Sequence, residues 1–251
     1  MTRTEQLDFM IKELMPGIAI PKEAADKWRM FRSLVNIRQP GPVSTAFLQV
    51  QDAFLKNETA QKGITRLEDL QPIADGIYLW QGDITTLAVD AIVNAANSGL
   101  TGCYRPCHGC IDNAIHTFAG VQLRNACAGI IAHQGYPEPT GRAKITAAYN
   151  LPSKFVIHTV GPIVYDKLTH EHEQQLAACY RSCLELADQN KLGSLAFCCI
   201  STGEFHFPNE RAAQIALHEV MKYHRNGGKC RVIFNVFIQK DWQIYNQLLK
   251  K

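Results

Sequence analysis

The spacing of apolar residues along the chain changes near residue 70. Before that point, apolar side chains recur at the spacing of helices that bury one face, and Pro16-Gly17 and Pro40-Gly41-Pro42 interrupt the pattern. The segment therefore predicts three helices, which run up to Leu14, from Pro21 to about Ile37, and from Ser44 to about Lys56.

After residue 76, short apolar runs alternate with longer helical stretches. Strands that are this short and this apolar are typical of a sheet covered on both faces. The alternation predicts an α/β fold, a three-layer α/β/α sandwich. The expected strands are 77–80, 91–94, 155–159, 195–200 and 232–237, and the expected helices lie near 111–129, 171–190, 208–225 and 241–250.

We therefore expect two parts, an N-terminal helical extension at 1–70 and a main domain at 71–251. No cluster of residues in the extension resembles a chemical site, so we expect it to cap the main domain. In open α/β sheets, ligands bind beyond the carboxyl ends of the strands. The polar motifs described below follow expected strands at such ends.

Composition narrows the class of protein. The 251 residues are 46% hydrophobic and 20% charged, which excludes a disordered, collagen-like or coiled-coil chain. No apolar run is long enough to span a membrane, and the first residues do not resemble a signal peptide, so we expect a soluble, cytoplasmic protein without a membrane partner. A net charge of +3 without a stripe of Lys and Arg argues against nucleic acid. This charge is compatible with a small anionic ligand held by backbone amides. We expect a monomer.

The segment 102–110, Gly-Cys-Tyr-Arg-Pro-Cys-His-Gly-Cys, places four soft ligands in one short loop before an expected helix. Thiolates and imidazoles are the ligands that zinc prefers, and three ligands with one open position are typical of a catalytic zinc. Spacing alone does not exclude Cys107 as a ligand. It also leaves open a reduced loop with incidental cysteines or a redox-active pair.

Two turns that follow expected strands could bind a ligand. Asp83, in Gly82-Asp-Ile-Thr85, could accept a hydrogen bond from an amine or cap the next turn. The segment 201–208 lies between a strand and a helix, so its backbone N–H groups could hold an anion, with Phe205 and Phe207 covering a ribose or a base. The alternative for this segment is an ordinary strand–helix connection.

Amides and a carboxylate flank the cysteine loop. Asn94 and Asn97 end an expected strand, where they could bind hydroxyl groups or simply form a turn. Asp112 begins the helix after the loop, where it could cap the helix or act as a general base beside a metal.

Four of these segments together resemble the macrodomain family of ADP-ribose-binding modules. They are 82–85, 89–97, 157–162 and 201–205, and they occur in the order of the family. The segment 102–116 replaces the glycine-rich loop of most macrodomains. With the N-terminal extension, this replacement resembles the zinc-containing subclass, whose members are protein ADP-ribose hydrolases.

The resemblance implies a macrodomain sandwich with a central mixed sheet and a role for each matching residue. It assigns Asp112 to the acidic position of the hydrolytic members and leaves Cys107 as the weakest ligand candidate. Its remaining assignments are Asp83 and Ile84 to adenine, Asn97 to the distal ribose, Ser201, Thr202, Gly203, Glu204 and Phe205 to the diphosphate, Phe207 to a ribose, and Cys103, His108 and Cys110 to one zinc ion.

The function implied is zinc-dependent removal of mono-ADP-ribose from protein side chains through a glycosidase-type hydrolysis. We expect an ester to Asp or Glu, or a similar O-linkage, with Asn97 orienting the ribose and Asp112 activating water or a ribose hydroxyl. The family also implies a lipoyl-carrier protein modified by a sirtuin-type transferase as a partner. The alternative is a non-catalytic reader of ADP-ribose with a structural zinc. Plain capture of the ligand needs neither the cysteine loop nor Asp112, so an enzyme is the favoured hypothesis.

Overall fold

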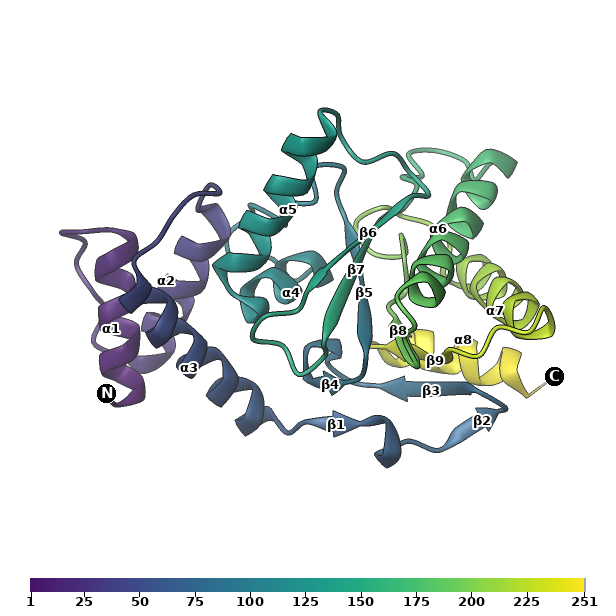
Figure 1. Ribbon diagram of the computed structural model, residues 1–251, viewed down its shortest axis with the longest axis horizontal. Coiled ribbons are helices and arrows are strands. Elements are labelled where there is room, and N and C mark those ends of the chain that lie inside the picture. The colour runs from purple at the N-terminus through teal and green to yellow at the C-terminus, as the bar shows by residue number, and fades with distance from the viewer. Residues whose placement is uncertain (251) are drawn as a thin grey trace.

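The structure is a computed structural model that describes residues 1–250, and a seven-stranded sheet lies at its centre (Figure 1). The strands of this sheet are β2 (Pro72–Ala74), β3 (Ile77–Gln81), β5 (Ala91–Ala96), β6 (Ala143–Ala147), β7 (Phe155–Val160), β8 (Ser194–Phe197) and β9 (Arg231–Val236). Their order across the sheet is β2-β3-β9-β8-β5-β7-β6. The five central strands are parallel and the two edge strands are antiparallel to them, so the sheet is mixed.

Helices cover both faces of the sheet. The helices are α1 (Arg3–Leu14), α2 (Ala24–Ile37), α3 (Thr45–Lys62), α4 (Ile111–Ala119), α5 (Val121–Gln134), α6 (His170–Gln189), α7 (Asn209–Arg225) and α8 (Gln239–Leu249). In Figure 1, α4 and α5 lie on one side of the sheet, and α6 and α7 lie on the other. The α/β/α sandwich with a mixed central sheet predicted from the sequence is confirmed.

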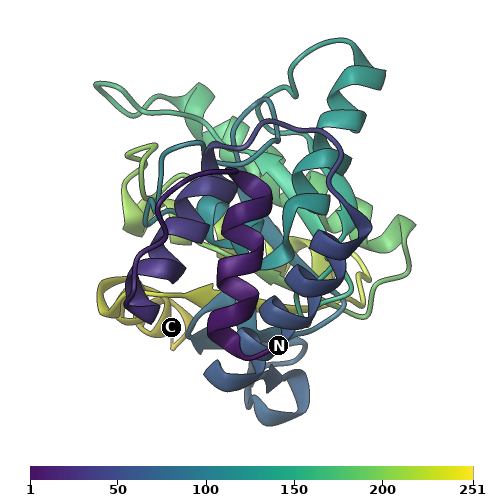
Figure 2. The ribbon, with the colours of Figure 1, turned by 90° about the vertical axis from the view of Figure 1, so that its left-hand side faces the viewer.

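Helix α1 packs on α2 and α3, and α2 and α3 pack on α4. Figure 2 views the molecule from the side of these three helices. The Trp28 ring lies 5.8 Å from that of Phe31, 5.7 Å from that of Phe54 and 5.9 Å from that of Phe118 in α4. This aromatic cluster makes the extension continuous with the core. The boundary expected between residues 70 and 71 stays a prediction.

Several elements differ from the expectations, and each difference has a physical reason. The edge strands β2 and β6 were not expected, because β2 is exposed and β6 alternates apolar residues with Lys144 and Thr146. The single helix expected over 111–129 is two helices separated at Gly120, whose φ of 93° ends α4. The third helix continues to Lys62, six residues beyond its expected end.

The parallel strands place their carboxyl ends at one edge of the sheet, and the loops that follow β5, β8 and β9 meet there. This is the edge at which open α/β sheets bind ligands. Among residues 1–250, no helix combines the length and the apolar composition that a membrane crossing requires.

Candidate active site

A cleft of about 800 Å³ opens at this edge of the sheet. Its walls come from the segments 95–97, 102–112, 198–205 and 235–241, together with Asn209 at the start of α7. The loop with the cysteines and the loop after β8 therefore face the same space. Most of the residues singled out in the sequence lie together in this cleft.

The carboxylate of Asp112 is held by two asparagine side chains. Asn94 donates to Oδ1 over 2.8 Å, and Asn97 donates to Oδ2 over 3.2 Å and to the Gly102 carbonyl over 3.0 Å. Asp112 is only 6% exposed, and this burial raises the pKa of its carboxyl to about 6 against the lowering effect of the amide hydrogen bonds. A hydrogen bond from an amide therefore holds each oxygen of the Asp112 carboxylate, and the side chain lines the cleft. A fixed carboxyl group with a pKa of about 6 is suited to exchange a proton with a ligand in the cleft.

Two buried imidazoles lie beneath this carboxylate. His158 lies with Nδ1 3.2 Å from Asn94 Nδ2 and with Nε2 3.0 Å from Thr146 Oγ1. His116 Nε2 lies 3.5 Å from Asp112 Oδ1. Burial lowers the pKa of His158 to about 3 and holds the pKa of His116 well below its ordinary value. Both rings are therefore neutral at pH 7 and do not neutralise the carboxylate.

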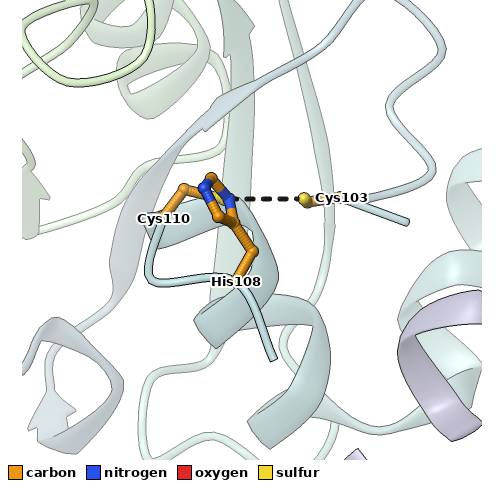
Figure 3. A group of neighbouring side chains, drawn as sticks. All are labelled: Cys103, His108 and Cys110. Atoms are coloured by element: carbon orange, nitrogen blue, oxygen red, sulfur yellow. Dashed lines mark hydrogen bonds between the residues drawn. The ribbon is translucent and has the colours of Figure 1, made fainter. Parts of the chain in front are cut away.

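The ligand atoms of Cys103, His108 and Cys110 lie within 4.8 Å of one another. Figure 3 shows the three side chains converging, with Cys103 Sγ 3.6 Å from His108 Nδ1. Cys107 points elsewhere, because its Sγ lies 3.2 Å from the hydroxyl of Ser33 in α2. The fold thus groups the three residues that the resemblance assigns to zinc and separates Cys107 from them.

A second group of possible ligands, His116, Cys127 and His158, also lies within 4.8 Å but is fully buried. Its members come from α4, α5 and β7, so no local spacing in the sequence indicates this group. Both ring nitrogens of His158 already face polar partners, Asn94 and Thr146. We therefore regard this group as part of the polar network under Asp112.

The loop after β8 turns tightly, and its backbone faces the cleft. Ser201 has a φ of 64°, and Phe207 N–H returns to donate to the Ser201 carbonyl over 2.9 Å. Among the described residues, the N–H groups of Gly203, Glu204 and Phe205 find no acceptor. Successive free N–H groups at a helix-preceding turn form an anion site.

Glu204 in this loop also approaches the cysteine loop. Its Oε1 lies 3.4 Å from Nε2 of His108, the ring nitrogen opposite the one that faces Cys103. A metal-bound histidine usually donates its other N–H to a carboxylate or a carbonyl. The contact joins the two loops that form opposite walls of the cleft.

Asp83, Ile84 and Phe207 are not among the residues that line the cleft. Asp83 caps the short helical turn Ile84–Thr86 by accepting from Thr85 N–H over 3.0 Å, and it pairs with Lys62 at 2.9 Å. Burial works to raise the pKa of Asp83, and these hydrogen bonds outweigh it and hold the pKa below its ordinary value. Ile84 and Phe207 are buried, so all three residues have structural contacts of their own.

The cleft also contains residues that the sequence analysis did not single out for binding. Phe237, expected as the last residue of a strand, instead follows β9 and is 71% exposed. It lines the cleft with Ile238 and Asp241, opposite the cysteine loop. The only signal in the sequence was the position of Phe237 at the end of an expected strand. An apolar run does not show at which residue the strand ends, so Phe237 could not be separated from the strand.

Known proteins with a similar sequence and fold show the class of protein to which this chain belongs. The profile of the Macro domain family matches residues 93–216, which carry Asn97, the cysteine loop, Asp112 and the loop after β8. The fold matches that of the Trypanosoma brucei macrodomain in complex with ADP-ribose, with a TM-score of 0.67 and 30% identity over 87% of this chain and 94% of that one.

Two relatives define the family more closely. The chain is 51% identical over 260 residues to a protein-ADP-ribose hydrolase of Treponema medium, which covers 99% of this chain and 100% of that protein. It is 50% identical over 237 residues to a protein-ADP-ribose hydrolase of Staphylococcus aureus, which covers 93% of this chain and 89% of that protein. The chain belongs to the protein-ADP-ribose hydrolase family of macrodomains, and the expectation of an enzyme is confirmed.

Proposed function

We propose that this enzyme hydrolyses the bond between mono-ADP-ribose and a protein side chain. One observation carries the proposal: a buried carboxylate, Asp112, lines the same cleft as a loop whose N–H groups at residues 203–205 have no acceptor among the described residues. This arrangement fits a ligand in which a diphosphate is joined to a reacting ribose. The names of the relatives, and the ADP-ribose bound to the trypanosome macrodomain, agree with it.

In the proposed complex, the N–H groups of residues 203–205 hold the diphosphate, and the Thr202 hydroxyl and the Ser201 backbone complete that loop. The exposed ring of Phe237 offers a face on which the adenine can stack. Asp83 and Ile84 remain the adenine contacts that the resemblance implies, although neither is among the residues that line the cleft. Phe207 would then act from within the core by supporting the loop beneath the ribose.

We propose that Cys103, His108 and Cys110 hold one zinc ion. The donor set fits the ion, because two thiols and an imidazole converge and the Glu204 carboxylate stands at the other imidazole nitrogen. Bound there, zinc would supply Lewis acidity toward a ribose hydroxyl or the scissile oxygen, or would lower the pKa of a bound water.

The chain's own residues account for orientation and proton transfer. The Asn97 amide is fixed by its bonds to Asp112 and the Gly102 carbonyl, and we assign it to the distal ribose. Asp112 accepts the proton from the water whose oxygen bonds to C1 of that ribose, and the side-chain oxygen leaves with the electrons of the broken bond. Holding both reactants in this geometry is itself a large part of such a rate enhancement.

The linkage and the partner are further parts of the proposal. An ester to Asp or Glu is the chemically easier O-linkage, so we propose it as the preferred substrate. A lipoyl-carrier protein modified by a sirtuin-type transferase, action in the cytoplasm and a monomeric state stay predictions from the sequence.

The test is release of free ADP-ribose from a protein that carries mono-ADP-ribose on a carboxylate, by the native enzyme and by Asp112→Ala. We expect rapid release by the native enzyme and a loss of at least about 100-fold in the variant, since general-base catalysis supplies that much. Binding of ADP-ribose without release by the native enzyme would instead support the reader hypothesis.

The role of zinc is tested in the same assay with Cys110→Ala. Loss of zinc and of turnover with an unchanged melting temperature would support a catalytic ion. A melting temperature that falls with activity would indicate a structural ion, and full turnover without zinc would contradict a catalytic role.

A further inference from the structure

Helix α2 of the N-terminal extension contacts the backbone of the cysteine loop directly. The Arg32 guanidinium donates to the His108 carbonyl over 2.8 Å through Nη2. The same group donates to Asn113 Oδ1 over 2.8 Å and 3.2 Å, and Asn113 in turn donates to the Arg105 carbonyl over 3.0 Å. One side chain of α2 thus fixes a metal-ligand residue and, through Asn113, an earlier part of the loop.

Asn36, one turn further along α2, holds the adjacent residue. Its Oδ1 accepts from Cys107 N–H over 2.9 Å, and its Nδ2 donates to Thr117 Oγ1 in α4 over 3.0 Å. Asn36 is only 1% exposed, so these bonds form away from water. Cys107 has a φ of 51°, which a side chain-bearing residue adopts only when its surroundings require it. Arg32 and Asn36 therefore bind the backbone of two consecutive residues, His108 and Cys107, at the turn of the loop.

Helix α2 is itself held rigidly against the main domain. Arg124 in α5 donates to the carbonyls of Val35, Asn36 and Arg38 over 2.9, 2.7 and 2.6 Å. A buried cation at the C-terminal end of a helix satisfies carbonyls that have no partner within the helix. Because α2 cannot shift easily, it provides a fixed support for the loop.

We propose that α2 positions the metal loop, with Arg32 and Asn36 as positioning residues that direct the His108 side chain toward Cys103 and Cys110. The inference rests on the proposed zinc site. A loop without regular structure would otherwise lose conformational entropy when it binds an ion, and holding it in advance strengthens binding. Groups that orient metal ligands in this way are worth about 10–100-fold in metal affinity.

The matched control lies on the same helix. Arg29 is exposed, whereas Arg32 one turn later is half-buried against the loop. We compare Arg32→Met with Arg29→Met, because each removes one positive charge from α2. Removal of a nearby positive charge by itself strengthens the binding of a dication. Weaker zinc binding in Arg32→Met but not in Arg29→Met would therefore show that Arg32 positions the loop.

The measurement is the zinc dissociation constant of the full chain, determined by competition with a chromophoric chelator. We expect it to rise about 10–100-fold in Arg32→Met, to rise less in Arg32→Lys, which retains one donor, and to stay unchanged in Arg29→Met. The ADP-ribose affinity of the metal-free proteins, measured by calorimetry, should be the same in all of them, which shows that the cleft is folded.

Unchanged zinc affinity in Arg32→Met would overturn this inference and leave the proposed zinc site intact. Equal weakening in Arg29→Met would overturn it as well. Failure of the unsubstituted protein to bind zinc would overturn the proposed metal site and this inference with it. If Arg32→Met does not fold, Arg32→Lys decides between the same outcomes.

Discussion

The side chains around Asp112 form a layered polar network. Two amides contact the carboxylate, and neutral imidazoles lie below them. Asn94 contacts both layers, since its Nδ2 lies near Asp112 and near His158 Nδ1. The network orients the carboxylate without a direct ion pair. Burial raises the pKa of Asp112, while the Asn94 amide, the charge of Arg124 and the Asn97 amide lower it.

His158 gives this network a measurable pH dependence. Burial lowers its pKa to about 3, whereas a histidine in an unfolded chain titrates near 6.5. Below pH 6.5 the unfolded chain takes up a proton that the folded protein excludes, so stability is lost as the pH falls toward 3. Between pH 6.5 and 3, His158 should lower the free energy of unfolding by about 1.4 kcal/mol for each unit by which the pH falls.

Urea unfolding of the native protein and of His158→Gln at pH 7.5 and 5.5 measures this effect. The native protein should lose about 1.4 kcal/mol more than the variant between the two pH values. His116 and the other titrating groups contribute to both proteins, so the difference between the two losses isolates His158. Equal losses would mean that His158 is protonated in the folded protein.

At this scale, the sequence predicted residue types better than contacts. Asn97 was identified from its place at the end of an expected strand and Asp112 from its place at the start of an expected helix, and the two side chains do lie together. Spacing could not separate Cys107 from the other loop ligands, because its direction depends on a positive φ and on Ser33, 74 residues away. His158 and Phe237 were not predicted as site residues, since their environments depend on pairing between distant strands.

Among the connecting segments, the loop after β8 depends on a close approach by the loop after β7. A Cβ atom on Gly161 would lie 2.0 Å from Ser201 Oγ and 2.9 Å from Ile200 Cγ2. Both contacts are shorter than van der Waals separation, so the loop that carries residues 201–205 would have to move. Gly161 therefore controls the shape of the proposed diphosphate site without touching the ligand.

We expect Gly161→Ala to weaken ADP-ribose binding by about tenfold or more, since each lost hydrogen bond to a charged group is worth about 1.5–3 kcal/mol. Calorimetry measures the affinity. The control is Gly129→Ala in α5, where a Cβ meets no atom within 4 Å and helix propensity improves. Unchanged affinity in Gly161→Ala would show that the loop adjusts without loss of its N–H groups.

The helices and the parallel strands were predictable because their apolar patterns are long or continuous. The edge strand β6 was not, because one flank lacks a neighbour and its side chains alternate with polar ones. The break between α4 and α5 follows from the positive φ of Gly120, and the surrounding residues continue a helical pattern across it. Each miss concerns a place where tertiary contacts, rather than periodicity, decide the backbone.

For the molecule as a whole, the N-terminal helices act as part of the core. Arg124, a buried cation, has its three carbonyl acceptors in or just after α2. The Gln51 side chain in α3 accepts from Val121 N–H over 3.0 Å and donates to Gln122 over 2.8 Å. Removing these helices would take away the acceptors of Arg124 and the partner of the α5 start, and would expose the apolar face of α4 that carries Phe118.

We therefore expect a chain that begins at residue 64 to lose cooperative thermal unfolding and its near-ultraviolet circular dichroism. Exposing a large apolar side chain that was buried costs about 1.5–3 kcal/mol, and several are exposed together, against a total stability of about 5–15 kcal/mol for a domain. A shortened chain with a sharp transition would contradict this expectation. It would instead support a separate extension with a boundary near residue 70.

The order of strands across the sheet has a consequence for synthesis. β3 pairs with β9 through partners such as Ile77 and Val232, more than 150 residues apart, and β9 also completes the row beside β8. Ribosomes add about 5–20 residues per second, so the backbone N–H and C=O groups along this edge of β3 stay unpaired for on the order of ten seconds. The part of the cleft formed by residues 235–241 is missing until β9 is synthesised. During that interval, a nascent chain needs another segment or a chaperone to cover β3 and prevent its pairing with other chains.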